Sequence, residues 1–103
     1  MSTAPLYRFE WDANKARTNQ QKHGVSFSLA SSVFHDALAI TIYDEEHSDR
    51  EQRWVTIGQA ANGQTLVVIH TFTQLDAATI ELRLISARKA DLQERQDYEQ
   101  AQR

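Results

Sequence analysis

The spacing of apolar residues changes along the chain, from a helical period near its start to alternation in its middle. Asp12 is a favourable N-cap for a helix over residues 13–23, and Gly24 stands where such a helix would end. Ser26 is a favourable N-cap for a second helix, whose apolar residues fall on one face and which ends at His35. The pattern therefore predicts two helices near the N-terminus.

The alternating residues that follow predict strands. Segment 66–72 is apolar on both faces and is the candidate central strand, and Asn62-Gly63 is the turn signal that joins it to the strand before it. Residues 7–11 also alternate and predict a short strand or an extended arm. Four main strands are expected to pair in chain order as an antiparallel meander, over residues 38–43, 53–58, 66–72 and 79–85.

A charged segment closes the chain and predicts a third helix, from Ser86 or Ala87 to about Gln100. Two N-terminal helices, an antiparallel four-stranded sheet meander and a C-terminal helix make an α+β fold, in which two helices can cover one face of the sheet. Glycine and proline are scarce and no linker or repeat interrupts the pattern. Residues 1–103 are therefore expected to form a single domain.

Composition narrows the classes of function. The chain has 103 residues, of which 41% are hydrophobic and 24% charged, and no cysteine, which excludes disulfides, thiolate metal sites and a cysteine nucleophile. The net charge of −3 argues against coating nucleic acid through bulk electrostatics, so any site for a polyanion must be local. No apolar run approaches the ~20 residues needed to cross a bilayer and no signal segment opens the chain, so a cytoplasmic protein is expected.

Two cations, Arg88 and Lys89, fall in the first turn of the expected C-terminal helix, where they oppose the helix dipole. One interpretation is that these side chains and the free backbone N–H groups hold a phosphate. The others are a salt bridge to a nearby acid, or a helix that begins two residues later. The spacing leaves all three open.

A second cluster lies in the expected loop between the first two main strands. Cleaving RNA without a metal needs a base for the 2′-OH, an acid for the leaving oxygen and a cation for the phosphorane. His47, Glu51 and Arg53 offer these three groups, and Trp54 can stack on a base. A solvated acidic loop would have a similar composition. Asp44 and His47 alone would make a weak metal site, so neither a metal nor another cofactor is expected.

The remaining basic and histidine residues have more ordinary interpretations. Lys22 and His23 lie in the last turn of the first helix, where a cation suits the helix dipole or contacts a phosphate. His70 lies in the candidate central strand and is expected to be a hydrogen-bonded core residue.

Three separated blocks of motifs occur in order along the chain. They are Phe9-Glu10-Trp11-Asp12 with Lys15-Ala16, Asn19 and Lys22-His23-Gly24-Val25; Asp44, His47-Ser48, Glu51 and Arg53-Trp54; and Arg83-Leu84-Ile85-Ser86-Ala87-Arg88-Lys89-Ala90 with Glu94-Arg95 and Tyr98. Together they resemble the BrnT family, the toxin half of the BrnT/BrnA type II toxin–antitoxin system. The resemblance covers about residues 8–99, nearly the whole chain.

The resemblance implies a RelE-like fold and a metal-independent endoribonuclease that cleaves cellular RNA and arrests growth. It also implies a partner, a BrnA-type antitoxin. This ribbon-helix-helix protein would cover the site, form a heterotetramer with the toxin and bind operator DNA. Under this reading the scissile phosphate binds to Arg53, Arg83, Arg88 and Lys89, proton transfer falls to His47 and Glu51, and Trp54, Lys22 and His23 contact the substrate at the margin.

One departure supports a second reading. Many family members carry an arginine just after the central strand, near Thr73, and this chain has none there. The alternative is a non-catalytic toxin homologue that acts as antitoxin partner and transcriptional co-repressor. A stand-alone DNA-binding protein is a third class, which the acidic composition and the lack of a basic recognition helix disfavour.

Overall fold

Six strands form one sheet at the centre of the computed structural model, which describes residues 5–102. Hydrogen-bonded neighbours follow the order β1-β6-β4-β3-β2, and β5 pairs with β6 beside this path. The strands are β1 (Leu6–Glu10), β2 (Ile40–Tyr43), β3 (Trp54–Gln59), β4 (Thr65–His70), β5 (Thr73–Gln74) and β6 (Thr79–Lys89). The helices are α1 (Ala13–His23), α2 (Phe27–Ser31) and α3 (Leu92–Gln100), and the 3-10 helix η1 (Ser32–His35) follows α2 directly.

The two N-terminal helices form where the sequence predicts them. The Asp12 carboxylate accepts a hydrogen bond from the Lys15 N–H at 2.9 Å at the start of α1. Gly24 ends this helix with a φ of 66°, in the left-handed region that favours glycine. The Ser26 hydroxyl accepts from the Leu29 N–H at 3.0 Å at the start of α2. Both caps are therefore confirmed, although α2 itself is short and passes into η1.

The sheet contains the four expected strands and two more. β2, β3, β4 and β6 pair antiparallel in chain order, as the alternation predicts. The expected four-stranded meander is nevertheless incomplete, because β1 pairs parallel to β6, with Leu6 opposite Thr79 and Glu10 opposite Arg83. The two-residue β5 also pairs with β6. The α+β class is thus confirmed, but the sheet is mixed.

The end of β6 corrects the expected position of the third helix. Segment Ser86–Lys89 is strand, and Ala87 pairs there with Val68 of β4. The helical prediction failed because the order of polar and apolar residues in segment 86–89 is compatible with either a helix or a strand. The strand that pairs with this segment, β4, lies far away in the sequence, so the local pattern could not reveal the pairing. Arg88 and Lys89 therefore do not stand at a helix N-terminus, so no free N–H groups of a helix start lie beside them to hold a phosphate.

The true start of α3 has a signal in the sequence. The Asp91 carboxylate accepts from the Glu94 N–H at 2.8 Å, and the Glu94 carboxylate accepts from the Asp91 N–H at 2.9 Å. This reciprocal capping box satisfies two backbone donors that a helix start leaves without partners. It fixes the first helical residue at Leu92.

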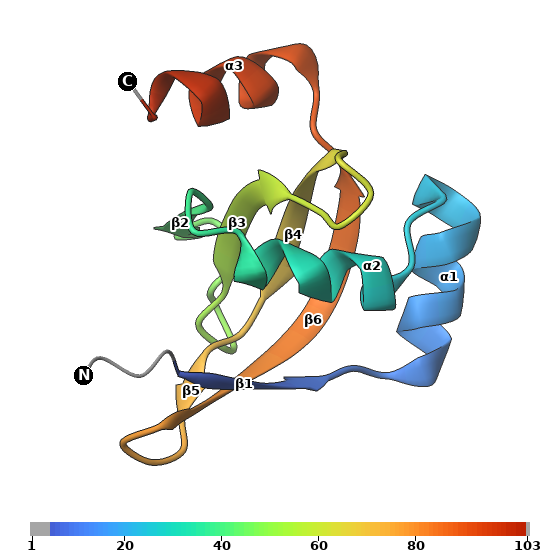
Figure 1. Ribbon diagram of the computed structural model, residues 1–103. Helices are drawn as coiled ribbons and strands as arrows, with labels where there is room; N and C mark the ends of the chain where they lie inside the picture. The colour runs from blue at the N-terminus through green and yellow to red at the C-terminus, as the bar shows by residue number, and fades with distance from the viewer. Residues whose placement is uncertain (1–4, 103) are drawn as a thin grey trace.

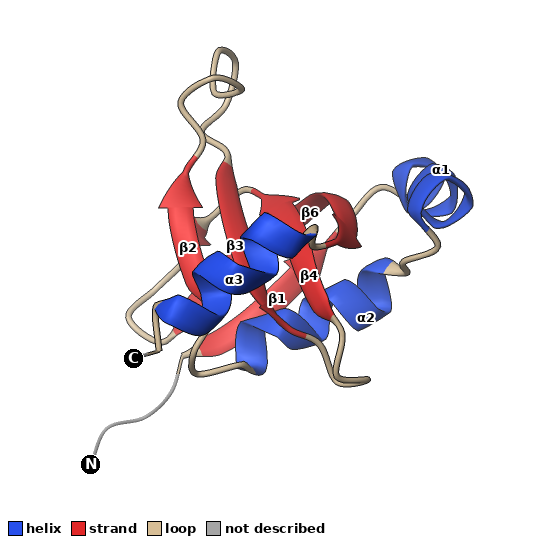
Figure 2. Ribbon diagram, turned by 90° about the horizontal axis from the view of Figure 1, so that it is seen from above, coloured by secondary structure: helices blue, strands red, loops and turns tan. Residues whose placement is uncertain are grey.

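The sheet has two different faces. Figure 1 shows α2 packed across one of them, which we call the inner face, and α3 beyond the ends of the strands. Figure 2, seen from above, shows α3 crossing over β3 at that end. The core lies between the inner face and α2, where Phe27, Val33, Leu66, Val68 and Leu84 are each at most 2% exposed.

The opposite, outer face is more open and carries the cations. Residues directly opposite one another on paired strands share a face, and neighbours along a strand alternate. Ser86 lies opposite Ile69, and Arg88 lies opposite Val67, while Arg83 adjoins the buried, inward-facing Leu84. A register shift between Ile69 and His70 marks a β-bulge at Ile85, which interrupts the alternation so that Leu84 faces inward and Ser86 faces outward. The outer face of β6 therefore presents Arg83, Ser86 and Arg88.

A single polar side chain fastens α1 to the sheet. β1 pairs with β6 only as far as Arg83, which leaves the edge of β6 free beyond that point. The Asn19 side chain fills this edge: its carbonyl accepts from the Ala87 N–H at 3.0 Å, and its amide donates to the carbonyls of Ala87 at 2.8 Å and Val25 at 2.9 Å. Asn19 is the buried residue of α1, so these hydrogen bonds, together with the partly buried Ala16 that packs against the core, hold this helix in place.

Candidate functional site

The loop between β2 and β3 is closed by its own hydrogen bonds. The Asp44 N–H donates to the Arg53 carbonyl at 2.9 Å. The Ser48 hydroxyl donates to the Asp44 carbonyl and accepts from the Arg53 N–H at 3.0 Å. These bonds join the two ends of the loop, so the residues between them are held close to the end of the β2–β3 strand pair.

Two arginines from different strands meet at one carboxylate. Arg83 of β6 donates to Oε2 of Glu51, and the Nε of Arg53 lies 3.6 Å from Oε1 of the same carboxylate. The three side chains are each about one-third exposed, at 32% to 37%. They line a hollow of about 460 Å³ together with His47 and Arg50, among others, and we call this hollow the Glu51 pocket.

The Glu51 pocket contains an unsatisfied donor. The Nε of Arg53 is buried and has no hydrogen-bond partner in the part of the chain that the structure describes. A buried N–H without an acceptor costs free energy, and a charged donor binds an anionic oxygen more strongly than a neutral one does. Oε1 of Glu51 lies 3.6 Å from this nitrogen, beyond hydrogen-bond distance.

His47 lines the same pocket and is oriented by a carboxylate. Its Nδ1 lies 3.0 Å and 3.1 Å from the two carboxylate oxygens of Asp44. Since a carboxylate only accepts, Nδ1 carries the proton, which leaves Nε2 able to exchange a proton with a ligand. The ring is open to solvent, with 63% of the side chain exposed, whereas Asp44 is only 15% exposed.

Arg88 lies on the same outer face but outside the Glu51 pocket. It lies five positions after Arg83 along the strand, a distance of about 16 Å. Its guanidinium donates to both oxygens of Glu94 at 2.7 Å and 2.8 Å, and this pairing lowers the pKa of the Glu94 carboxyl. Arg88 therefore joins β6 to α3 in this structure. Of the interpretations that the sequence left open for Arg88, the salt bridge to a nearby acid is the one that matches its contacts in the structure.

Two other predicted substrate contacts also lie away from the pocket. Lys89 pairs with Leu66 and lines a separate hollow below α3, near Arg95. Trp54 lies opposite the inward-facing His70, and its ring packs against Tyr43 with the centroids 5.1 Å apart. The structure thus brings His47, Glu51, Arg53 and Arg83 together and leaves Trp54, Arg88 and Lys89 elsewhere.

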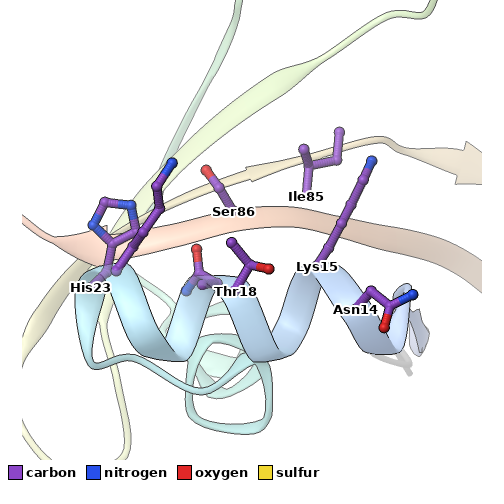
Figure 3. A pocket seen from close by; sticks show the side chains of 8 residues that line it. Asn14, Lys15, Thr18, His23, Ile85 and Ser86 are labelled. Atoms are coloured by element: carbon purple, nitrogen blue, oxygen red, sulfur yellow. The ribbon is translucent and has the colours of Figure 1, made fainter.

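Lys22 and His23 line a second hollow, between α1 and β6. Figure 3 shows the side chains of Lys15 and His23 rising from α1 beside Ser86 and Ile85 of β6. Lys15 was not among the predicted site residues. The signal that could have found it is the composition of residues 13–23, which contain cations and no acid.

The comparisons with known proteins agree on one family. Residues 11–94 match the family described as the ribonuclease toxin, BrnT, of type II toxin-antitoxin systems. The chain belongs to the BrnT family. The resemblance seen in the sequence is therefore confirmed. Membership of a type II toxin–antitoxin family also brings with it a protein antitoxin as partner.

A solved BrnT structure has a similar fold. The ribonuclease toxin BrnT of Brucella abortus, known from a crystal structure at 1.1 Å resolution, is 24% identical in sequence and superposes with a TM-score of 0.57. The match covers 84% of this chain and 97% of that chain. This likeness concerns the fold alone. A search among curated proteins gave no match.

The position at which many BrnT members carry an arginine lies beside the Glu51 pocket. Thr73 begins β5 and, with Phe72, lines a shallow hollow that also includes Glu51 and Arg83. An arginine side chain at residue 73 would therefore lie close to the carboxylate of Glu51. In this chain Arg50, from the β2–β3 loop, is an additional guanidinium that lines the Glu51 pocket.

His70 is the hydrogen-bonded core residue that the sequence predicts. It is 1% exposed, its Nδ1 donates to the Thr71 carbonyl at 3.0 Å, and its Nε2 accepts from the Thr56 hydroxyl at 2.7 Å. The Thr41 hydroxyl in turn lies 2.8 Å from that of Thr56 and completes the chain as donor. Burial lowers the pKa of His70, and the hydrogen bond to Thr71 only partly opposes this. Burial therefore favours the neutral form of the ring in the folded protein.

The lowered pKa of His70 predicts a pH dependence of stability. The unfolded chain binds a proton at this residue below about pH 6.5, whereas the folded protein resists it. The free energy of unfolding should therefore be highest above that pH and fall as the pH drops through it. Urea denaturation at several pH values checks this. The variant His70→Asn, which has no titrating ring, should lose less stability over the same range; equal losses in both proteins would contradict the assignment.

Two structural features are absent from residues 5–102. No helix there is long and apolar enough to cross a membrane. No group of three or more histidine, aspartate or glutamate side chains is arranged there as a metal site.

Proposed function

We propose that this chain is the toxin of a type II toxin–antitoxin pair and a metal-independent endoribonuclease whose active site is the Glu51 pocket. One observation carries the proposal: guanidinium groups from two strands converge on one carboxylate beside a carboxylate-oriented imidazole. Such a pocket supplies from protein groups alone the base, the acid and the cations that RNA cleavage requires.

In the proposed reaction the ribose 2′-oxygen attacks the adjacent phosphorus. Glu51 takes the proton of the 2′-OH as the bond from this oxygen to phosphorus forms. The bond from phosphorus to the 5′-oxygen of the next nucleotide breaks, and protonated His47 gives the Nε2 proton to this leaving oxygen. The products are a 2′,3′-cyclic phosphate and a 5′-OH end.

The arginines stabilise the extra negative charge of the phosphorane. Arg83 and Arg53 are held in position by Glu51 before substrate arrives, so little reorganisation is needed when the charge develops. Guanidinium groups can donate charge-assisted hydrogen bonds to the non-bridging phosphate oxygens. Arg88, Lys89 and Trp54 take no part in this chemistry because they lie outside the pocket, whereas Lys22 and His23 contact the substrate beyond the cleaved bond.

The family supports further expectations about the assembly. The antitoxin partner would be a BrnA-type ribbon-helix-helix protein that blocks the Glu51 pocket and carries the operator DNA, in a heterotetramer. The chain would act as one domain in the cytoplasm, without a cofactor.

The experiment incubates the purified toxin with single-stranded RNA in excess chelator. Cleavage with 2′,3′-cyclic phosphate ends is expected, and RNA methylated at every 2′-oxygen should remain whole because its nucleophile is blocked. Added antitoxin should stop the reaction. Unmethylated RNA that stays intact, whether or not divalent metal is added, would refute the catalytic proposal.

The second candidate is a non-catalytic homologue that serves as antitoxin partner and co-repressor. It is favoured by the pairing of both pocket arginines with Glu51, which already neutralises part of their charge in the free chain. Induced expression without the antitoxin separates the two functions, because a co-repressor alone should not stop growth.

A further inference from the structure

Helix α1 is strongly cationic in an acidic protein. Its sequence from residue 13 to residue 23 contains Lys15, Arg17, Lys22 and His23 and no acid, while the whole chain has a net charge of −3. Apart from the buried Asn19, the helix is mostly exposed. Because so much positive charge is gathered on one helix, it can attract a polyanion locally even though the protein as a whole repels one.

The cations of α1 face a groove rather than open solvent alone. A hollow of about 340 Å³ lies between α1 and β6 and is lined mainly by Lys15, Thr18, Lys22 and His23 on one side and by Ile85 and Ser86 on the other (Figure 3). No carboxylate belongs to this lining in the described chain. The groove therefore combines cations, hydroxyl donors and one apolar side chain, which suits a sugar–phosphate backbone.

The lysines of the groove are free to bind. Within residues 5–102, the ammonium groups of Lys15 and Lys22 make neither an ion pair nor a hydrogen bond. In the Glu51 pocket, by contrast, Arg53 and Arg83 already contact a carboxylate. A phosphate that enters the groove therefore displaces no internal partner.

The groove and the Glu51 pocket are lined by nearby residues of the same strand, β6. Arg83 lines the pocket, while Ile85 and Ser86 line the groove. The residue between them, Leu84, points to the inner face and is 1% exposed. At about 3.3 Å per strand residue, Arg83 and Ser86 are some 10 Å apart. A strand of RNA lying along the outer face of β6 would thus reach both sites with neighbouring phosphates.

We propose that the groove between α1 and β6 binds the sugar–phosphate backbone of single-stranded RNA on one side of the bond that is cut in the Glu51 pocket. This rests on the proposed ribonuclease function. Lys15 and Lys22 neutralise the phosphates, and Ser86 and Thr18 offer hydroxyl donors. A flexible single strand is required, because only there can the ribose turn to attack in line with the leaving oxygen.

The test compares Lys15→Gln and Lys22→Gln with Arg17→Gln. Arg17 is the matched control, since it lies on the same helix, loses the same charge and does not line the groove. Each protein is assayed on an RNA of about 12 nucleotides, which can fill both sites, and on a dinucleotide, which can fill only the Glu51 pocket. The lysine variants should raise KM for the longer RNA roughly tenfold each, more than Arg17→Gln does, and they should affect cleavage of the longer RNA more than cleavage of the dinucleotide.

Binding separates this proposal from the ribonuclease proposal. Fluorescence anisotropy with the same 12-nucleotide sequence methylated at its 2′-oxygens measures affinity whether or not the protein cleaves, and each lysine variant should lower the salt dependence by about 0.7 in log–log slope. If no protein cleaves RNA but the lysine variants bind it more weakly than Arg17→Gln does, the groove proposal is supported and the ribonuclease proposal is refuted. The groove proposal is overturned if the lysine variants match Arg17→Gln on the longer RNA, or if they slow dinucleotide cleavage equally.

Discussion

Replacing Arg83 by alanine is expected to slow RNA cleavage by about 10²- to 10³-fold, the usual loss when one preorganised donor to the transition-state charge is removed. The physical reason is the position of Arg83, whose guanidinium is held against Glu51 at the centre of the pocket. The loss should fall on kcat rather than on KM, because the interaction strengthens as charge develops on the phosphorane. Single-turnover assays on a short RNA measure this directly.

The control for Arg83→Ala is Arg8→Ala. Arg8 also lies on a strand of this sheet and its Nε is 3.8 Å from Glu81, but its side chain is 70% exposed and it lines neither the pocket nor the groove. Its removal should leave the rate unchanged. Arg83→Lys should recover only part of the rate, because an ammonium cannot make the paired contacts of a guanidinium. If Arg83→Ala cleaves at the parental rate, Arg83 is not part of the active site.

Replacing Asn19 by alanine is expected to lower the free energy of unfolding by about 3 kcal/mol, since buried backbone groups lose their partners and cannot reach water. Three hydrogen bonds disappear together: one to the N–H of Ala87 and two to the carbonyls of Ala87 and Val25. The N–H and carbonyl of Ala87 lie on the edge of β6 that no strand covers. Urea denaturation at neutral pH measures the change.

The control for Asn19→Ala is Asn14→Ala, the same substitution at an exposed position of the same helix. It should change the free energy of unfolding by no more than about 0.5 kcal/mol. A similar small effect of Asn19→Ala would mean that α1 is held by something other than this side chain. The comparison also bears on function, because Asn19 fixes the distance between the cations of α1 and the outer face of β6.

Elements governed by local chemistry were predictable from the sequence. Asp12, Gly24 and Ser26 mark helix ends through contacts with residues three or four positions away, and the structure places those ends where the sequence predicts them. The alternation over residues 79–85 likewise predicted a strand there, in which Leu82 and Leu84 are each 1% exposed. The capping box of Asp91 and Glu94 was equally local, and applying it would have avoided the misplaced helix start.

The candidate site was predictable only in part. His47, Glu51 and Arg53 stand within a few residues of one another, so the sequence could group them. Arg83 joins them because β3, β4 and β6 are neighbours in the sheet, and the family resemblance rather than spacing pointed to it. Lys15 was missed, because nothing local shows that α1 lies against the edge of β6.

The sequence by itself determined the helix caps, the four principal strands, the α+β class and, through its motifs, the BrnT family. The tertiary structure decided that β1 runs parallel to β6, that residues 86–89 are strand, and that Arg88 binds Glu94 while Arg83 reaches Glu51. The division has a physical reason. Caps and alternation depend on residues that are close along the chain, whereas strand pairing and charge convergence depend on groups that only folding brings together.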